Sequence, residues 1–224
     1  MSSTEYHVNR RELQFVVMEV LEAGKLCGFE AFSDFDEDLF SMTINEACTF
    51  AEQVLDPINQ SGDREGCRVE EGTVKTPQGF PEAWRQMGEG GWLSMKMSPE
   101  FGGMGLPELV TVAAKEVQLA ANQSLCIGNT LTTGAANLIY TFGSEVQKQE
   151  YCEKMFNGTW SGTMCLTEPH AGSSVGDIIT TALQQPEGHY LIKGTKQFIS
   201  AGDHDMSENI IHLLLARTGG APEG

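Results

Sequence analysis

Basic side chains are scarce in this sequence of 224 residues, where 14 lysines and arginines stand against 31 acidic residues and leave a formal net charge of −17. A surface of that sign repels phosphate backbones and anionic membranes, so nucleic acid is not expected as a partner. An acidic surface is also explained by solubility alone. The charge therefore excludes classes of partner and identifies none.

Long apolar runs and paired cysteines are also missing. No apolar stretch approaches the roughly 20 residues that span a bilayer, so we expect no membrane span. We expect no targeting segment either, because Glu5 and Glu12 interrupt the opening. The cysteines form no Cys-x-x-Cys pair, and no histidine stands at zinc-ligand spacing. We interpret them as reduced packing residues of a cytoplasmic protein, in preference to a disulfide framework or metal site: Cys27, Cys48, Cys67, Cys126, Cys152 and Cys165.

Apolar residues recur at helical spacing in the first two thirds of the chain. Asn9 has capping-box-like spacing to Glu12, and the apolar face behind it carries Leu13, Val16, Val17, Val20 and Leu21. A second helix is predicted over 39–55, and Asp56-Pro57 is expected to end it because the residue before a proline is disfavoured in a helix. Its buried side is expected to carry Ile44, Ala47, Cys48, Ala51 and Leu55.

The next part of the chain is expected to alternate turns with further helices. Residues 59–82 are rich in glycine and charge, and we interpret them as a surface connection with one short hairpin. The glycines of SPEFGGMGLPE do not have dinucleotide-fingerprint spacing, which favours a tight turn. The helices are predicted over 84–92, from Pro107, from near Asn129, and over 145–156, where Ser144 caps the helix with Gln147.

After Gly158 the apolar spacing becomes that of strands, predicted over 159–166, 188–193, 196–200 and 209–216, with a hairpin turn at Gly194-Thr195. Helices followed by strands indicate an α+β chain with separate helical and sheet parts, not a doubly wound fold. The predicted sheet has few strands and unpaired edges, so we expect the chain to be the front part of a longer protein.

Two segments of this last third indicate a binding site. MCLTEPHAGSSVGD occupies residues 164–177, and IKGTKQFISAG occupies residues 192–202. Pro169 cannot donate a backbone hydrogen bond and favours a turn, and the small residues 171–174 let the backbone approach a bulky ligand closely. Thr167 and Ser173 add hydroxyl groups without charge. Either segment alone is typical of an ordinary turn between strands, and the residues alone leave this interpretation open.

These segments resemble the two flavin-contacting segments of acyl-CoA dehydrogenases. PEFGGMGLP resembles the family's glycine turn. The opening EYHVNRRELQFVVMEVL and the stretch TPQGFPEAW resemble the larger members with an N-terminal extension, such as the 3-methylmercaptopropionyl-CoA dehydrogenases. The resemblance implies an extension at 1–38, an N-terminal α-helical domain at 39–158, and at 159–224 the start of a β-barrel-like middle domain. The family's C-terminal helical domain is then absent from this chain.

The resemblance also implies FAD as the cofactor, held by Met164, Leu166, Thr167, Gly172, Ser173, Phe198, Ile199 and Ser200. Ser173 would also bind the acyl-CoA substrate. Phe198 stands where many relatives have tryptophan, and Ser174 where many have aspartate. Glu168 is expected to be structural, with the catalytic base beyond Gly224. No metal is expected, and we interpret His170 and His204 as loop histidines.

The implied reaction is the FAD-dependent α,β-dehydrogenation of a saturated acyl-CoA to the trans-2-enoyl-CoA, as in fatty acid metabolism. Electrons would pass to electron-transfer flavoprotein or a similar acceptor, and the enzyme would be a homo-oligomer. The chain alone is expected to be incomplete and inactive. Two alternatives stay open: a non-catalytic relative that binds acyl-CoA or a partner, and a flavin oxidase on the same fold.

Overall fold

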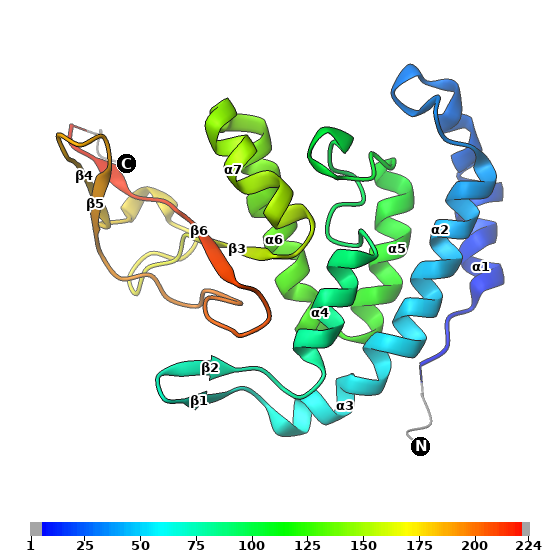
Figure 1. Cartoon of the computed structure of the whole chain (residues 1–224), viewed down its shortest axis with the longest axis horizontal. Helices are drawn as coiled ribbons and strands as arrows, with labels where there is room; N and C mark the ends of the chain where they lie inside the picture. The colour runs from blue at the N-terminus through cyan, green and yellow to red at the C-terminus, as the bar shows by residue number, and fades with distance from the viewer. Residues whose placement is uncertain (1–5, 221–224) are drawn as a thin grey trace.

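The computed structural model describes residues 6–220, so the outermost residues of the predicted segments 1–38 and 159–224 lie outside the described part. Helices from the first two thirds of the chain stand side by side as a bundle, and the strands of the last third lie at one side of it (Figure 1). The predicted α+β order of helices followed by strands is therefore confirmed.

The first helix, α1 (Arg10–Gln14), continues as a π-helical segment over Phe15–Val20. Asn9 caps it as predicted, because the Asn9 side chain accepts a hydrogen bond from the Glu12 backbone N–H at 3.2 Å. The apolar face is only partly buried: Val17 is buried, whereas Val16, Val20 and Leu21 are exposed. The i→i+5 bonding of a π-helix turns residues away from the α-helical spacing on which that prediction rests.

The second helix, α2 (Glu37–Phe50), runs through a π-helical segment at Ala51–Leu55 into α3 (Asp56–Glu65). The predicted end at Asp56-Pro57 is therefore wrong. Pro57 lies in the first turn of α3, and the residue before it, Asp56, keeps helical backbone angles. The predicted buried face is confirmed, because its residues are fully buried: Ile44, Ala47, Cys48, Ala51 and Leu55. The short hairpin is also confirmed, as β1 (Arg68–Glu70) and β2 (Thr73–Lys75).

The remaining helices are α4 (Phe80–Glu89), α5 (Glu108–Ala121), α6 (Gln123–Phe142) and α7 (Glu145–Phe156). Helix α7 has the predicted bounds and capping box. Helix α6 begins before Asn129, because the Asn122 side chain caps it by accepting from the Leu125 N–H at 3.1 Å. The glycine turn before α5 is tight, since a Cβ on Gly103 would lie 2.2 Å from the Met97 carbonyl oxygen.

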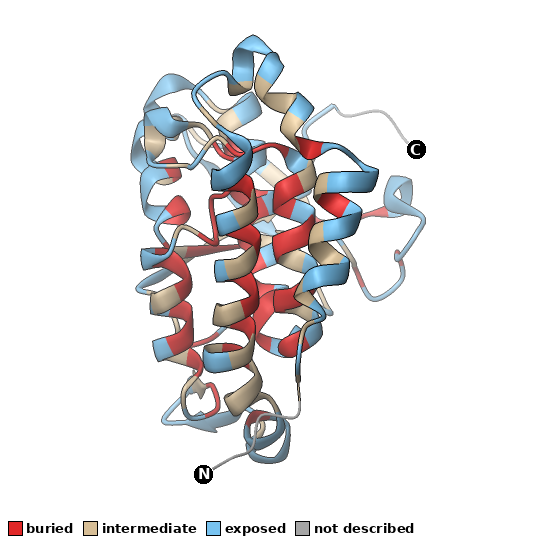
Figure 2. Cartoon of the chain, turned by 90° about the vertical axis from the view of Figure 1, so that its right-hand side faces the viewer, coloured by how far each residue is buried: buried red, intermediate tan, exposed pale blue. Residues whose placement is uncertain are grey.

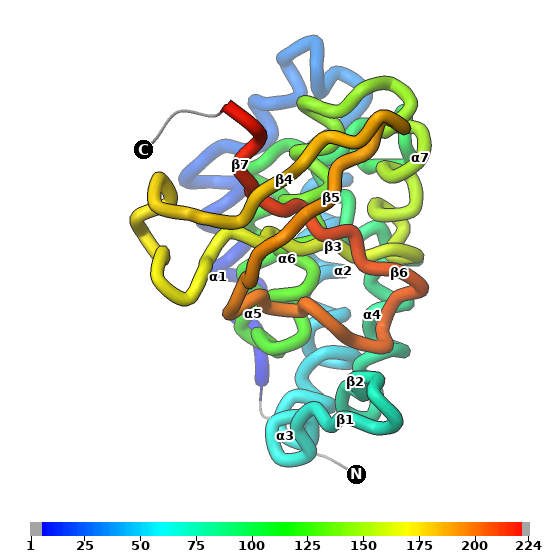
Figure 3. The backbone as a smooth tube through the Cα atoms, turned by 90° about the vertical axis from the view of Figure 1, so that its left-hand side faces the viewer, coloured from blue at the N-terminus to red at the C-terminus, as the bar shows by residue number. Residues whose placement is uncertain are grey.

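The strands of the last third form small sheets, drawn in the left half of Figure 1 and on the side that faces the viewer in Figure 3. Strand β3 (Trp160–Cys165) pairs in parallel with β6 (Asn209–Leu214). Strand β4 (Thr181–Gln184) pairs with β5 (Tyr190–Lys193) in an antiparallel hairpin and with β7 (Arg217–Thr218) in parallel.

The strands predicted over 159–166, 188–193 and 209–216 are confirmed, whereas the strand at 196–200 and the hairpin turn at Gly194-Thr195 are wrong. The residues at 196–200 form an irregular segment, because the Gln197 backbone N–H bonds to Thr167 and not to a strand that follows β5. The partner of β5 is β4, which sequence reasoning missed.

Two apolar clusters hold these elements together, and Figure 2 shows the buried positions on the faces where the helices meet. The larger cluster fills the bundle around Trp84, whose indole N–H donates to the Gly158 carbonyl at 2.9 Å. The smaller lies between α6, α7 and the β3–β6 pair. The Gly162 N–H of β3 also donates to the Thr132 hydroxyl of α6 at 3.0 Å. The β3–β6 pair therefore packs directly against the bundle. Among residues 6–220, no helix is long and apolar enough to cross a membrane.

Candidate functional site

The two sequence segments that predict a ligand site lie side by side. Strand β3 ends at Cys165, and the chain continues irregularly through Leu166 and Thr167. The Gln197 backbone N–H donates to the Thr167 carbonyl at 3.0 Å, and the Lys196 ammonium donates to the Leu166 carbonyl at 2.9 Å. Although β4 and β5 separate them in the chain, the segments are joined by direct hydrogen bonds.

Glu168 is buried at this junction, with only 1% of its side chain exposed. Its carboxylate accepts from the N–H of Ile179 at 2.8 Å, the N–H of Thr180 at 3.1 Å, and the Lys196 ammonium at 2.8 Å. Burial acts to raise the pKa of Glu168, but these hydrogen bonds outweigh it and lower the pKa to about 2. The carboxylate stays charged at neutral pH and has the contacts of a structural residue, in agreement with the expectation for it.

The turn after Glu168 is closed by two backbone hydrogen bonds, from Glu168 N–H to the Ala171 carbonyl at 2.9 Å and from Ala171 N–H to the Glu168 carbonyl at 3.1 Å. Gly172 and Ser173 follow on the surface, and no atom lies within 4 Å of where a Cβ of Gly172 would be. The backbone of this turn is open to a ligand, as the small residues predict.

Phe198 combines exposure with an unusual backbone. Its side chain is 85% exposed, and its φ of 59° lies in the left-handed region. A bulky residue is seldom held there, at a cost of roughly 1–3 kcal/mol, and such strain clusters at ligand sites. Ser200 is exposed and Ile199 half-buried on the same segment. An exposed aromatic ring on a strained backbone favours a binding role over a packing role.

The remaining predicted contacts differ in how open they are. Leu166 is exposed and Thr167 half-buried beside the junction. Met164 is half-buried and packs against the cluster between α6 and α7, so part of its side chain belongs to the core. Sequence reasoning missed Lys196, whose side chain is 7% exposed. The signal that could have identified it is its position as a lysine inside the otherwise uncharged stretch GTKQFISAG.

These residues suit a flat, largely apolar cofactor with a charged tail. Leu166 and Phe198 expose apolar surface, the Thr167 and Ser200 hydroxyls can meet polar ring edges, and the open backbone at Gly172 and at Ser173 suits a diphosphate. The residues present fit FAD.

His170 and His204, the two histidines interpreted from the sequence, differ in burial. His170 is exposed, with Nε2 3.1 Å from the Asp177 carbonyl oxygen. His204 lies in a loop, as interpreted from the sequence, but is buried. Its Nδ1 accepts from the Met206 N–H at 3.1 Å, which assigns the proton to Nε2, 3.0 Å from the Ser161 hydroxyl oxygen. Burial lowers the pKa of His204. Within the part of the chain that the structure describes, no group of His, Cys, Asp or Glu residues has the arrangement of a metal site.

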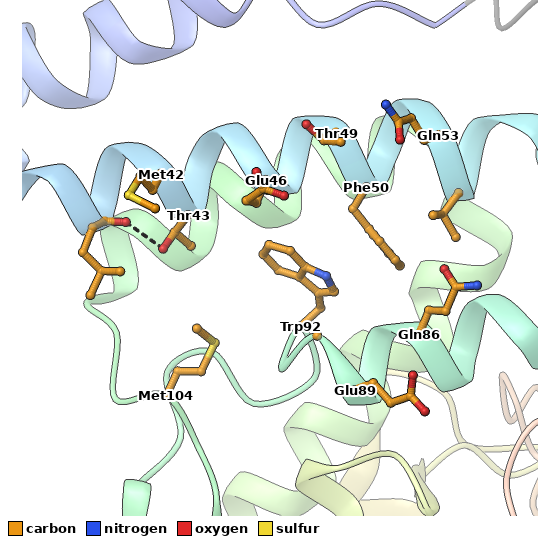
Figure 4. Close-up of a pocket in the computed structure, with 13 residues that line it drawn as sticks. Met42, Thr43, Glu46, Thr49, Phe50, Gln53, Gln86, Glu89, Trp92 and Met104 are labelled. Atoms are coloured by element: carbon orange, nitrogen blue, oxygen red, sulfur yellow. Dashed lines mark hydrogen bonds between the residues drawn. The ribbon is translucent and has the colours of Figure 1, made fainter.

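A separate pocket of about 600 Å³ lies between α2, α4 and the loop that carries Trp92 and Met104 (Figure 4). The rings of Phe50 and Trp92 meet there with centroids 5.8 Å apart. Glu46 and Glu89 also line it. It shares no lining residue with the two segments, so it is not part of the candidate site.

The fold and the site define a helical–β protein in which two segments of the last third are joined by direct hydrogen bonds. The family model for the acyl-CoA dehydrogenase N-terminal domain matches residues 37–159, and the chain belongs to the acyl-CoA dehydrogenase family. The resemblance inferred from the motifs is confirmed.

Similar proteins agree with this membership. The chain is 40% identical to 3-methylmercaptopropionyl-CoA dehydrogenase of Ruegeria pomeroyi, over 98% of this chain and 37% of that protein. It is 36% identical to butyryl-CoA dehydrogenase of Syntrophomonas wolfei, over 100% of this chain and 37% of that protein. The solved structure of an acyl-CoA dehydrogenase complexed with FAD from Bacillus anthracis aligns with a TM-score of 0.68 and 25% identity, over 84% of this chain and 30% of that one. The chain thus spans about 37% of the length of these two curated relatives.

Proposed function

We propose that this chain supplies the N-terminal region and part of the flavin site of an enzyme that converts a saturated acyl-CoA thioester to the trans-2-enoyl-CoA. The observation that carries this proposal is the junction of the two motif segments, where the Gln197 N–H meets the Thr167 carbonyl at 3.0 Å beside the exposed ring of Phe198. Family membership supplies the reaction class.

We propose that the cofactor is FAD and that it is held by Met164, Leu166, Thr167, Gly172, Ser173, Phe198, Ile199 and Ser200. FAD, when bound, supplies the oxidant that accepts the hydride from the substrate β-carbon. The Leu166 and Phe198 side chains would cover apolar ring surface and exclude water from it. Ser173, on the open turn, would also border the acyl-CoA.

The α-proton of the substrate needs a carboxylate base whose pKa lies near neutrality. Glu168 does not meet this requirement, because its pKa is about 2 and its oxygens already accept three hydrogen bonds. We therefore propose that the base comes from outside residues 1–224, and that this chain alone does not complete the reaction.

We further propose a place in fatty acid metabolism, a cytoplasmic location, a homo-oligomeric enzyme, and electron-transfer flavoprotein or a similar protein as the electron acceptor. We also propose three parts of the chain: an N-terminal extension at 1–38, the helical domain at 39–158, and the start of the β domain at 159–224. The names of the two relatives suggest butyryl-CoA and 3-methylmercaptopropionyl-CoA as first substrates to examine.

A matched pair of substitutions in the full-length protein tests the flavin site. Phe198 and Phe142 are both highly exposed, at 85% and 81%, but Phe142 lies at the end of α6, outside the predicted site. Phe198→Ala is expected to weaken FAD binding roughly 5- to 30-fold, which corresponds to the loss of an aromatic contact of about 1–2 kcal/mol. Phe142→Ala is expected to leave it unchanged.

The FAD dissociation constants of the two variants are measured by titrating each apoprotein with FAD and recording the flavin fluorescence. Equal affinities for the two variants would remove Phe198 from the site. A full-length wild type that binds no FAD would defeat the flavoenzyme proposal and leave the non-catalytic relative. Rapid reoxidation of substrate-reduced protein by oxygen alone would favour the flavin oxidase.

A further inference from the structure

Three segments of the chain converge on the ion pair between Glu168 and Lys196. Lys196 donates to the Glu168 carboxylate at 2.8 Å and to the Leu166 carbonyl at 2.9 Å. The same carboxylate accepts from the backbone N–H groups of Ile179 and Thr180. The pair therefore ties the end of β3, the stretch before β4 and the irregular segment after β5 to one point.

Both charges of this pair are buried, with 1% of the Glu168 side chain and 7% of the Lys196 side chain exposed. A buried charge that loses its partner is strongly destabilising, whereas removing both charges together is much less so. Packing alone therefore does not require charged side chains at positions 168 and 196. What the two charged groups provide, and apolar groups cannot, is a set of directed hydrogen bonds to the backbone of three segments.

The stretch before β4, residues 178–180, is also held by hydrogen bonds on its other side. Arg217 of β7 donates from Nε to the Ile178 carbonyl at 2.7 Å, and its backbone N–H donates to the Thr180 carbonyl at 2.8 Å. The backbone at 178–180 is thus held by Glu168 on one side and by Arg217 on the other. Because this backbone fixes the Glu168 carboxylate, the carboxylate can in turn fix the position of the Lys196 ammonium.

We infer that Glu168 and Lys196 are positioning residues for the flavin site, and that their hydrogen bonds set Leu166, Thr167 and Phe198 in place before FAD binds. This inference rests on the proposed function. Neither residue is expected to touch the reacting atoms. Their action is on the backbone: Lys196 fixes the Leu166 carbonyl, and its neighbour Gln197 holds the Thr167 carbonyl.

The test uses the full-length protein with Lys196→Met, Glu168→Gln, and the double variant that carries both changes. Lys196→Met leaves the Glu168 charge buried without its cation, and Glu168→Gln turns an amide NH₂ toward groups that are themselves donors. The matched control is Glu145→Gln, because Glu145 pairs with Lys148 at 2.9 Å but its side chain is 74% exposed. The readouts are the urea midpoint, the FAD dissociation constant, and the visible spectrum of the FAD-saturated protein.

Each single variant is expected to raise the FAD dissociation constant on the order of tenfold or more, and to change the band shape of bound FAD. The double variant is expected to recover most of the urea midpoint, because no lone charge remains buried, while its FAD binding stays weak. Glu145→Gln is expected to match the wild type in all three readouts. A double variant that regains wild-type FAD affinity and spectrum would show a purely structural role and overturn the inference.

A measurement without any variant covers the case in which the variants fail to fold. Amide exchange of Ile179, Thr180 and Gln197 in the FAD-free wild type is expected to be slow, since their N–H groups are already bonded. Fast exchange that becomes slow only with FAD would overturn positioning before binding. Failure of the wild type to bind FAD defeats the proposed function instead, so the two failures are distinguishable.

Discussion

Gly162 lies where strand β3 packs against helices α6 and α7, and it allows a quantitative prediction. A Cβ on Gly162 would lie 2.6 Å from Met155 Cε and 2.7 Å from Ala135 Cβ. The methyl end of Met155 can rotate away, but the Ala135 Cβ moves only with the α6 backbone. Overpacking of this kind costs about 1–3 kcal/mol, and loss of the glycine's freedom in the unfolded chain returns about 0.5–1 kcal/mol. Gly162→Ala is therefore expected to lower the free energy of unfolding by roughly 1–2 kcal/mol.

Gly134→Ala is the matched control, one residue from Ala135 on the same helix. Gly134 is exposed, and nothing lies within 4 Å of where its Cβ would be. The substitution is expected to stabilise the protein by about 0.5–1 kcal/mol, because alanine is the better helix former. Urea unfolding measures both, with an unchanged m-value as the sign that only stability differs. If Gly162→Ala is as stable as Gly134→Ala, the packing of β3 on α6 described above is wrong.

Two further predictions concern titratable groups. The pKa of Glu168 is lowered from 4.5 to about 2 in the folded protein, so its stabilising effect is complete above about pH 4.5 and is lost as the pH falls toward 2. Urea midpoints across this range should therefore fall more steeply for the wild type than for Glu168→Gln, and parallel curves would contradict this. Cys67 is exposed, whereas burial raises the pKa of Cys126 to about 12. A thiol reagent at pH 8 should therefore modify Cys67 first, which mass spectrometry of the labelled protein checks, with Cys67→Ser as the control; equal rates at the two thiols would be inconsistent with the fold.

Local signals in the sequence predicted the helical part well. The buried face of α2 follows from its 3.6-residue spacing, and the bounds of α7 follow from Ser144 and Gln147, whose contacts lie within one helical turn. The continuation into α3 was missed because Pro57 is compatible with a first helical turn as well as with a helix end. The sequence does not distinguish these cases without the packing around it.

The strand-rich part depended more on contacts between distant residues. Lys196–Ser200 alternates like a strand, yet the Gln197 N–H is bonded to Thr167. The sequence and the resemblance singled out both segments of the proposed site, but they did not predict the junction of these segments through Glu168. The carboxylate and the Lys196 ammonium that it binds are 28 positions apart, and only the course of β4 and β5 brings them to 2.8 Å.

The visible absorption spectrum of the full-length protein, before and after anaerobic addition of butyryl-CoA and 3-methylmercaptopropionyl-CoA, is the most direct measurement of the proposed function. We expect a flavin spectrum that bleaches with at least one saturated acyl-CoA. A protein that shows no flavin and binds none when FAD is added would contradict the assignment of 164–177 and 192–202 as a flavin site.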